Sequence, residues 1–464
     1  MKRVVVVLII LLAASRAEAH VGSPDVFFEG DAGPYHLFVT VRVPQVIPGV
    51  ATIEIRSSAA DVDSLSVVPM RLTGPGSELP PADDPATRSP DDPQFFTASL
   101  WLMERGSLQV RITVTGARGP ATLAVPVPAM ALRTLTMDRG LGALLFGLML
   151  LLAASLVSIV AAAVRESALP AGAPLPPRRR VRIATVLAAG LVIGLIVLGN
   201  AWWTSSADSY ERSTFKQWEL RPRVDGCKLS LPVKMDLLAD HGHLLHLFLI
   251  RLPGLDHLTH LHPERADGGF VQTLPTLPAG HYQLFADIVW PGGFPLTGIA
   301  QLDLPDLHCP ELTGDDTAWS GAALGGKTTI SSQLPDGGSM IWDRPAELRA
   351  GVSLALHFHV VDRDGQPASD LEPYMGMAAH AELVRSDMTV FAHVHPDGSV
   401  AMPALELTRK PSMDMDAMPG MAHGPISPAL AFPFGFPQPG SYRIFVQIKR
   451  AGRIETGVFD APVD

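Results

Sequence analysis

The sequence has little cysteine, few aromatic side chains and no excess of basic residues. Its two cysteines in 464 residues are sparse, and no Cys-x-x-Cys spacing supports a thiolate metal site. Aromatic residues make up only 6%, beside 41 glycines and 42 prolines, which predicts many short strands and turns rather than long helices. The formal net charge of −10, with no long basic stripe, argues against a nucleic-acid partner.

Catalytic motifs are also missing. The chain has no Gly-x-Ser-x-Gly, His-Glu-x-x-His or Cys-x-x-Cys motif, so we do not expect an enzyme. Residues 321–328 formally match a phosphate-binding loop, Gly-x-x-x-x-Gly-Lys-Thr. A strand-and-turn sequence follows them where that loop requires a helix, so we expect no nucleotide partner.

Long apolar runs divide the chain. Residues 1–19 carry a positive start, an apolar centre and an Ala-x-Ala end, which predicts a signal peptide, cleaved before His20 or retained as an anchor. Residues 140–164 and 183–203 are uncharged and each long enough to cross a bilayer. The intervening residues 165–182 hold five arginines against one glutamate, which predicts a cytoplasmic loop.

This topology places the parts before and after the hairpin outside the cytoplasm. We expect a protein of the bacterial inner membrane, in contact with the lipid bilayer, with both parts in the periplasm or extracellular space. In an oxidising compartment Cys227 and Cys309 are expected to form a disulfide.

The other segments are expected to be mainly β. Alternating apolar and polar residues predict a β-sandwich over 20–136 and two more over 223–310 and 339–464. A polar tether, 204–222, and a Gly-, Ser- and Asp-rich linker, 311–338, connect them. The predicted fold is therefore three extracytoplasmic sandwiches, with a transmembrane hairpin between the first and the second.

The last two sandwiches repeat one pattern. Each has a histidine strand, a His-x-His-Pro motif, a strand with the sequence Gly-x-Tyr and a closing Thr-Gly. The first copy starts at His246 and the second at His380. The second carries a long insertion before its Pro-Gly-Ser-Tyr.

Fourteen of the sixteen histidines lie between His241 and His423, which is more than a generic core requires. In a strand, residues i and i+2 face the same side. His393 and His395 therefore share one face, as do His357 and His359. If the two strands are neighbours, up to four imidazoles share that face, with His380 within reach. Imidazole suits Cu(II), Zn and Ni alike.

Methionines favour copper. The insertion holds Met413, Met415, Met418, Met421 and His423, and Met375 and Met377 precede His380. Thioethers bind Cu(I) far better than they bind Zn or Mg. The alternative is that these methionines only fill gaps.

The first repeat offers a second candidate set near its own His-x-His-Pro: His243, His246, His260 and His262, with His241 and His257 in the same histidine-rich segment. A Cu(II) or zinc-like site and a purely structural role are both open for it. His20, if it becomes the N-terminus, is a further candidate copper chelate, the alternative being a coincidence of cleavage. His281 is expected to be an exposed strand residue.

The mature start His20-Val-Gly-Ser-Pro resembles that of CopC-type periplasmic copper-resistance proteins. The two repeats, with their His-x-His-Pro and Gly-x-Tyr strands, resemble YtkA-like domains. The second resemblance implies immunoglobulin-like sandwiches and metal handling outside the cytoplasm.

The favoured function is a membrane-anchored metal-binding protein that binds copper for tolerance, storage or delivery to a protein partner. The alternative is an envelope scaffold built of immunoglobulin-like domains that binds no metal and docks another envelope protein.

Overall fold

The computed structural model describes residues 23–166, 169–170, 172–409 and 425–464 and contains the β-strands expected from the sequence. The signal peptide predicted over 1–19 lies outside these residues. The chain is mainly β and divides into two units. One unit holds the described residues up to Met130 together with Lys216–Asp464, and the other is Ala131–Phe215.

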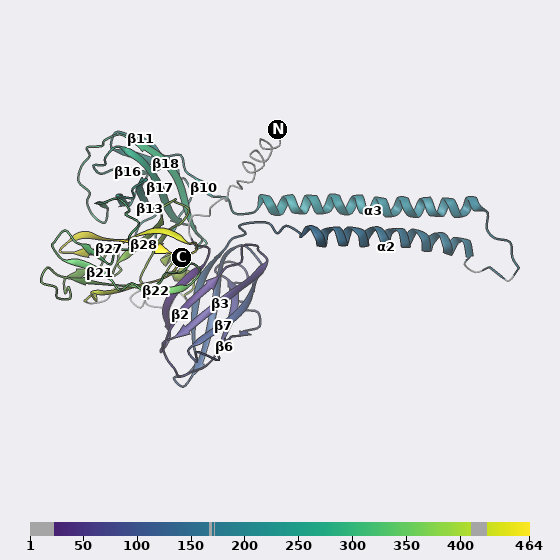
Figure 1. The fold of residues 1–464 in the computed structure, drawn as a ribbon, viewed down its shortest axis with the longest axis horizontal. Helices are drawn as coiled ribbons and strands as arrows, with labels where there is room; N and C mark the ends of the chain where they lie inside the picture. Colours follow the sequence, from purple (N-terminus) through teal and green to yellow (C-terminus); the bar gives the residue numbers. More distant parts are fainter. Residues whose placement is uncertain (1–22, 167–168, 171, 410–424) are drawn as a thin grey trace. The chain divides into compact units, whose positions relative to one another are not determined.

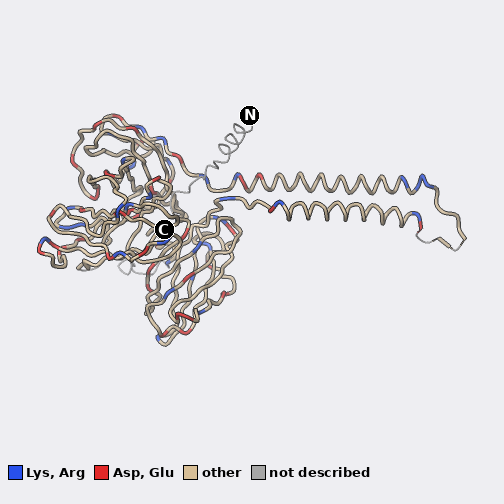
Figure 2. The backbone as a smooth tube through the Cα atoms, in the orientation of Figure 1, with Lys and Arg blue, Asp and Glu red and all other residues tan. Residues whose placement is uncertain are grey.

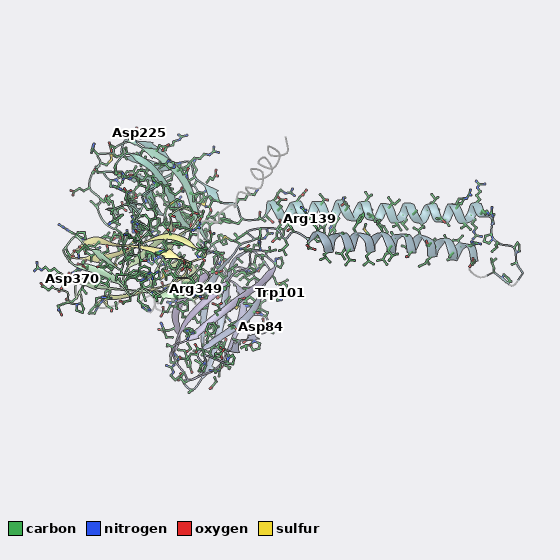
Figure 3. All side chains as sticks on the ribbon, in the orientation of Figure 1. Asp84, Trp101, Arg139, Asp225, Arg349 and Asp370 are labelled. Carbon is green, nitrogen blue, oxygen red and sulfur yellow. A yellow bond between two sulfur atoms is a disulfide. The ribbon has the colours of Figure 1, made fainter. Side chains whose placement is uncertain are left out.

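The N-terminal part of the first unit forms two antiparallel sheets (Figure 1). The first contains, in order, β1 (Val26–Ala32), β2 (Tyr35–Arg42), β3 (Gly49–Ser57), β7 (Phe95–Leu102) and β6 (Thr87–Arg88). The second contains β5 (Asp84–Pro85), β4 (Val62–Arg71), β8 (Gly106–Gly116) and β9 (Ala121–Ala129). Alternate residues such as Val39, Ile53 and Ile112 are fully buried, whereas Trp101 on β7 is largely exposed (Figure 3).

The second unit consists mainly of two apolar helices, α2 (Arg139–Glu166) and α3 (Arg178–Arg212), which run side by side (Figure 1). Both are long and apolar enough to cross a membrane. Their charged side chains lie at the helix ends (Figure 2). The helices are longer than the predicted spans. The last arginines of the predicted loop form the first turns of α3, and the first nine residues of the predicted tether form its last turns.

The first repeat also has two sheets. The larger contains, in order, β10 (Trp218–Glu219), β18 (Pro295–Leu304), β17 (Gly280–Val289), β13 (His246–Leu252), β14 (His257–Leu261) and β19 (Thr317–Ser320). The smaller contains β11 (Arg223–Asp225), β12 (Lys228–Leu231), β16 (Gly269–Thr273) and β15 (Glu264–Ala266). Strand β19 comes from the predicted linker, which therefore contributes to this sheet.

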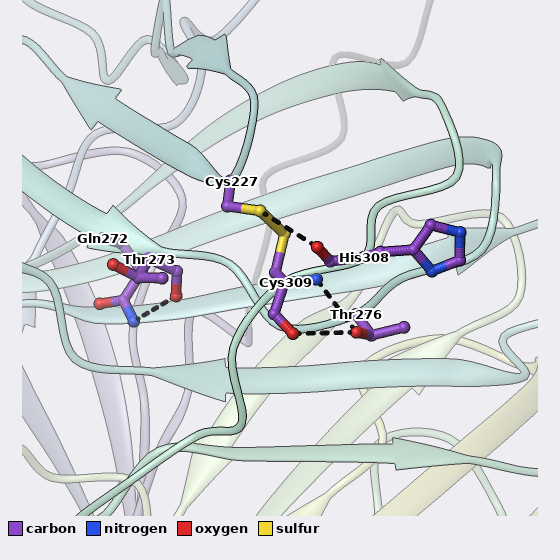
Figure 4. Close-up of a disulfide and its surroundings, with 6 residues drawn as sticks. All are labelled: Cys227, Gln272, Thr273, Thr276, His308 and Cys309. Carbon is purple, nitrogen blue, oxygen red and sulfur yellow. Dashed lines mark hydrogen bonds between the residues drawn. A yellow bond between two sulfur atoms is a disulfide. The ribbon is translucent and has the colours of Figure 1, made fainter.

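The expected disulfide between Cys227 and Cys309 is present, with an S–S distance of 2.03 Å (Figure 4). Nearby, Thr276 accepts a hydrogen bond from the backbone N–H of Cys309 and donates one to its carbonyl oxygen. The bond ties the start of β12 to the segment that follows β18, so it closes the first repeat.

The second repeat has the same two-sheet plan. One sheet contains, in order, β20 (Ser331–Gln333), β21 (Ser339–Trp342), β22 (Ser353–Val361) and β26 (Ala429–Gly435). The other contains β23 (Leu371–Glu372), β27 (Gly440–Arg450), β24 (His380–Arg385) and β25 (Phe391–Val394), with β28 (Arg453–Val463) paired to β27. A short helix, α4 (Met402–Leu407), follows β25.

The two repeats pack together through their histidine-bearing sheets. In β13, Leu247 and Leu249 point into the core of the first repeat, whereas Phe248 and Ile250 belong to a separate apolar cluster. That cluster also contains Val384, Phe391 and Phe445 of the second repeat. The rings of Phe285 and Phe391 stack across it with centroids 4.1 Å apart. The sheet containing β13 therefore faces the sheet containing β24.

The N-terminal sheets reach the second repeat through β1. The ring of Phe27 enters the core of that repeat and lies 5.5 Å from the ring of Phe434. The backbone of β1 also pairs with the loop after β25, because Glu29 donates to the carbonyl of Asp397 and Ser399 donates to that of Phe27, at 2.8 and 2.9 Å. Strand β1 therefore fixes the loop that follows His395.

Candidate metal centre

A matching turn precedes the first histidine strand of each repeat. Residues 240–243 and residues 374–377 each close on themselves through an antiparallel bridge. The second residue of each turn, His241 or Met375, has a positive φ of 52° or 51°, and a glycine follows it. Each turn begins six residues before its strand histidine, His246 or His380. The methionines of the second turn therefore stand where the first turn has histidines.

This turn carries a side chain of the first repeat onto the second. The imidazole of His241 is 1% exposed, and its Nδ1 donates to the carbonyl oxygen of Met375 across 3.2 Å. Its ring centroid lies 4.5 Å from that of His395 and 5.1 Å from that of His380. A left-handed backbone costs a non-glycine residue about 1–2 kcal/mol, so the turn holds His241 in this position at the expense of backbone strain.

Eight imidazoles gather between the facing sheets, and we call them the histidine layer. Strand alternation places His246, His260, His380 and His393 on the facing sides of β13, β14, β24 and β25. The layer consists of His241, His243, His246, His260, His262, His380, His393 and His395. Neighbouring rings are in contact from one end to the other, for example His243 on His262 at 3.9 Å, His260 near His393 at 5.3 Å and His393 near His395 at 4.8 Å between centroids.

One three-histidine group crosses the two repeats. It consists of His241, His380 and His395, which each offer a ring nitrogen within 4.8 Å of the others. Both ring nitrogens of His380, both of His395 and Nε2 of His241 are buried without a hydrogen-bond partner among the residues that the structure describes. A buried polar atom without a partner costs about 1–3 kcal/mol. These rings therefore carry buried nitrogens whose lone pairs or N–H groups have no partner in the described chain.

The other group lies in the first repeat and consists of His246, His260 and His262. Nε2 of His246 donates to the carbonyl oxygen of Asp240 at 3.0 Å, and Nδ1 of His262 contacts Oδ1 of Asp316 at 2.9 Å. Oxygen atoms that hold the outer nitrogen of a histidine fix its orientation and increase its basicity toward a metal. The inner nitrogens of this group are thereby directed toward one another.

Two of these inner nitrogens are unusually placed. Nδ1 of His246 lies 3.1 Å from Nε2 of His260. The outer nitrogen of His260 donates to Oε1 of Gln447 at 2.8 Å, so each neutral ring has already used its single N–H. The two nitrogens that face each other, Nδ1 of His246 and Nε2 of His260, then each present a lone pair to the other. A metal ion about 2.0 Å from each, with an N–metal–N angle of roughly 100°, fits this separation.

Burial keeps these imidazoles neutral. It lowers the pKa of His241 and of His246 to about 4, and it lowers the pKa of His260, His380 and His395 well below its usual value. A neutral imidazole is the form that binds a metal. These five rings therefore require no deprotonation to bind an ion at neutral pH.

Buried carboxyl groups line the same region. Burial raises the pKa of Asp240 to about 6 and that of Asp287 and Asp397 to about 7, and it raises that of Glu382 well above its usual value. The sequence reasoning did not identify these four, or Gln447. Glu382 and Gln447 occupy inward-facing strand positions next to histidines. A polar residue at a position that strand alternation turns inward is the sequence signal by which they could be identified.

The sequence-predicted residues separate into four sets. The structure brings together His243, His246, His260, His262, His380, His393 and His395, and places His241 from the same histidine-rich segment with them. Met375 and Met377 are buried in the turn beside His241. His20, Met413, Met415, Met418, Met421 and His423 lie outside the described residues.

His357 and His359 do not join the layer. They share one face of β22, and Leu356, Phe358 and Val360 fill the core as expected. However, β22 pairs with β21 and β26, whereas β25 pairs with β24, so the strands expected to be neighbours belong to different sheets. His357 is exposed, and His359 pairs with Asp343 at 3.2 Å. The expected face of four imidazoles is therefore wrong.

Comparison with known proteins identifies one family model, described as a domain of unknown function (DUF8832), which matches residues 332–464. No curated protein matches the chain. The resemblance to YtkA-like and CopC-type domains stays a prediction.

Similar solved structures include an engineered protein, 16% identical with a TM-score of 0.17, for which the alignment covers 21% of this chain and only 21% of that one. A bacterial ice-binding adhesin is 8% identical over 94% of this chain and 99% of its own, with a TM-score of 0.16. A fragment of the ICAM-5 ectodomain is 9% identical over 92% of this chain and 77% of its own, with a TM-score of 0.15. Scores this low carry no argument.

Proposed function

We propose that this protein is a membrane-anchored, extracytoplasmic metal-binding protein, and that the histidine layer binds copper for tolerance, storage or delivery to a protein partner. The observation that carries the proposal is the 3.1 Å approach of Nδ1 of His246 to Nε2 of His260, whose outer nitrogens are both held by oxygens. Neutral rings in that arrangement repel each other unless a cation lies between them.

Copper is favoured over zinc by the methionines. Met375 and Met377 are buried, and they stand at the positions that His241 and His243 take in the other repeat. Methionines in the turn that contacts His241 favour Cu(I), because thioethers bind Cu(I) far better than they bind Zn. The methionines of residues 413–421 add to this preference from the sequence alone.

The location follows from the helices and the cysteines. We infer that α2 and α3 form a transmembrane hairpin, because both helices are long and apolar enough to cross a membrane. A cluster of arginines also lies where the hairpin turns, at the end of α2 and the start of α3. A disulfide in the first repeat fits an oxidising compartment. We propose the bacterial inner membrane, with three immunoglobulin-like sandwiches on its outer side.

The layer supports binding rather than turnover, because most of its rings are buried between two sheets and burial raises the pKa values of the carboxyl groups around them. The competing scaffold function would make the same histidines structural. It requires that the protein bind no metal more tightly than exposed histidines do.

The test uses the full chain, purified in detergent. Bound metals are measured by mass spectrometry, and Cu(I) affinity is measured by competition with a chelator. His260→Gln should reduce the affinity strongly, whereas His281→Gln, on an exposed strand position paired with Asp303, should not. A wild type that binds copper no more tightly than exposed histidines do would reject the proposal in favour of the scaffold.

A further inference from the structure

We propose that the histidine layer holds two metal ions next to each other, one in each three-histidine group. This inference rests on the proposed metal-binding function and specifies its stoichiometry. The first position is formed by His241, His380 and His395, and the second by His246, His260 and His262.

The number of imidazoles exceeds what one ion can use. Protein sites for zinc or Cu(I) take about four ligands, and the two groups alone supply six. A single ion would leave the rings of one group buried with unpartnered nitrogens. In the first group those nitrogens include both of His380 and both of His395. With two ions, the histidine nitrogens of both groups have a metal partner.

The two groups have separate geometries. The second group is already held by oxygen partners on its outer nitrogens, at 3.0, 2.8 and 2.9 Å. The first has one such contact, from His241 to the Met375 carbonyl. The groups also differ in origin, since the second comes from one repeat and the first needs both. An ion in one group therefore cannot take over the histidines of the other group unless the facing sheets move.

The two positions are nonetheless adjacent. The ring of His393 lies 5.3 Å from that of His246 and 4.8 Å from that of His395, and its Nε2 is buried without a partner in the described chain. Across the boundary, His241 and His246 are 6.3 Å apart, as are His260 and His380. His393 therefore stands between the groups and is available to either ion.

The repeat provides the reason for two positions. His246, His260 and His262 correspond to His380, His393 and His395 in the duplicated pattern. Each repeat thus brings its own three strand histidines to the interface. The turn of the first repeat then adds His241 to the ligands from the second repeat. Duplication of one half-site, followed by face-to-face packing, yields two sites.

The experiment titrates the full chain in detergent with Cu(I), in competition with a chelator, and counts the copper retained. The wild type should retain two ions. His262→Gln should retain one, through the first group, and His395→Gln should retain one, through the second. The matched control His359→Gln, outside the layer, should retain two. Thermal unfolding and disulfide content establish that each variant is folded.

The outcomes are distinct. Retention of one ion by the wild type, lost in both variants, would overturn the two-ion inference and leave the proposed function intact. No retained copper in the wild type would reject both. If a variant fails to fold, the wild type loaded with Cu(II) decides the question by electron paramagnetic resonance. Two adjacent ions give a half-field signal, and a single ion gives none.

Discussion

His260 in the first repeat donates a hydrogen bond from Nδ1 to Oε1 of Gln447 in the second repeat, across 2.8 Å. The bond joins the facing sheets and directs the other ring nitrogen toward His246. The orientation of the second three-histidine group thus depends on a residue from the other repeat.

Substitution of Gln447 should therefore weaken metal binding without removing a ligand. We expect Gln447→Met to lower copper affinity about 10- to 100-fold, the usual effect of losing a partner that orients a metal-binding histidine. Chelator competition measures it. Gln301→Met, at an exposed position on β18, is the control. An unchanged affinity for Gln447→Met would show that His260 needs no such partner.

Arg443 forms a buried ion pair within the second repeat and also contacts the first repeat. Its guanidinium binds both carboxylate oxygens of Asp460, at 2.7 and 3.0 Å, and donates to the carbonyl of Leu255 in the first repeat. Arg443→Met should lower the free energy of unfolding by about 3–5 kcal/mol, because Asp460 is left buried and unpaired. Urea unfolding measures this loss.

The control for that substitution is Arg349→Met. Arg349 pairs with Glu347, and both are exposed, so its loss should cost no more than about 1 kcal/mol. If both substitutions lower the free energy of unfolding by the same amount, the buried ion pair stabilises the chain no more than the exposed one does.

The metal-free protein should be most stable near pH 6.5. The pKa of His246 is about 4 in the folded chain against 6.5 unfolded, so the unfolded chain binds more protons in that window and stability falls as the pH falls through it. Six other layer histidines have lowered pKa values and act in the same direction.

Buried carboxyl groups act in the opposite direction. The pKa of Asp240 is raised to about 6, so its stabilising contribution is present at low pH and is lost as the pH rises through 6. Around the histidine layer, five carboxyl groups have raised pKa values, against seven histidines with lowered ones. We therefore expect urea unfolding to give a lower stability at pH 4 than at pH 6.5. Stability that rises steadily toward pH 4 would contradict this balance.

The disulfide should stabilise the chain measurably. Cys227 and Cys309 are 82 residues apart, and closing a loop of that length stabilises a protein by about 4–5 kcal/mol in the chain-entropy description. The double variant Cys227→Ser with Cys309→Ser should unfold at correspondingly lower urea. Reductant should lower the stability of the wild type and leave the variant unchanged.

Gly398 should be required for the contact with β1. It has a φ of 122°, and a Cβ there would lie 2.0 Å from the carbonyl oxygen of Phe27. Gly398→Ala should therefore separate β1 from the loop that follows His395, and its overlap should cost roughly 1–3 kcal/mol beyond backbone strain. Limited proteolysis and copper counting are the measurements.

Gly365→Ala is the matched control, because Gly365 also has a positive φ but no atom lies within 4 Å of the place that an added Cβ would take. This variant should lose stability only through backbone strain, and it should retain as much copper as the wild type. Equal behaviour of the two variants would mean that the β1 contact does not support the metal centre.

The sequence was a good guide to local structure. The period-two pattern identified the histidine strands, and the two apolar runs identified the helices. The compartment argument identified the disulfide. Each of these features depends on neighbours in sequence or on a single pairing of side chains.

The sequence could not predict which sheets meet. His357-x-His359 and His393-x-His395 have the same spacing, yet only the second lies in the layer, because alternation determines the side of a strand and not the sheet it joins. The inward position of Glu382 and the reach of His241 across the repeats likewise follow from tertiary packing.

The pairing of β1 with the loop 395–399 has a consequence for biogenesis. One partner is among the first residues to leave the ribosome after the predicted signal peptide, and the other is made after more than 360 further residues, with both apolar helices in between. In the proposed topology, the N-terminal sheets therefore cross the membrane and wait, with Phe27 uncovered, until the last repeat arrives. Such a late contact is slow to form and leaves apolar surface exposed meanwhile. A truncated chain should thus need a chaperone throughout its life, whereas the whole chain needs one only in transit.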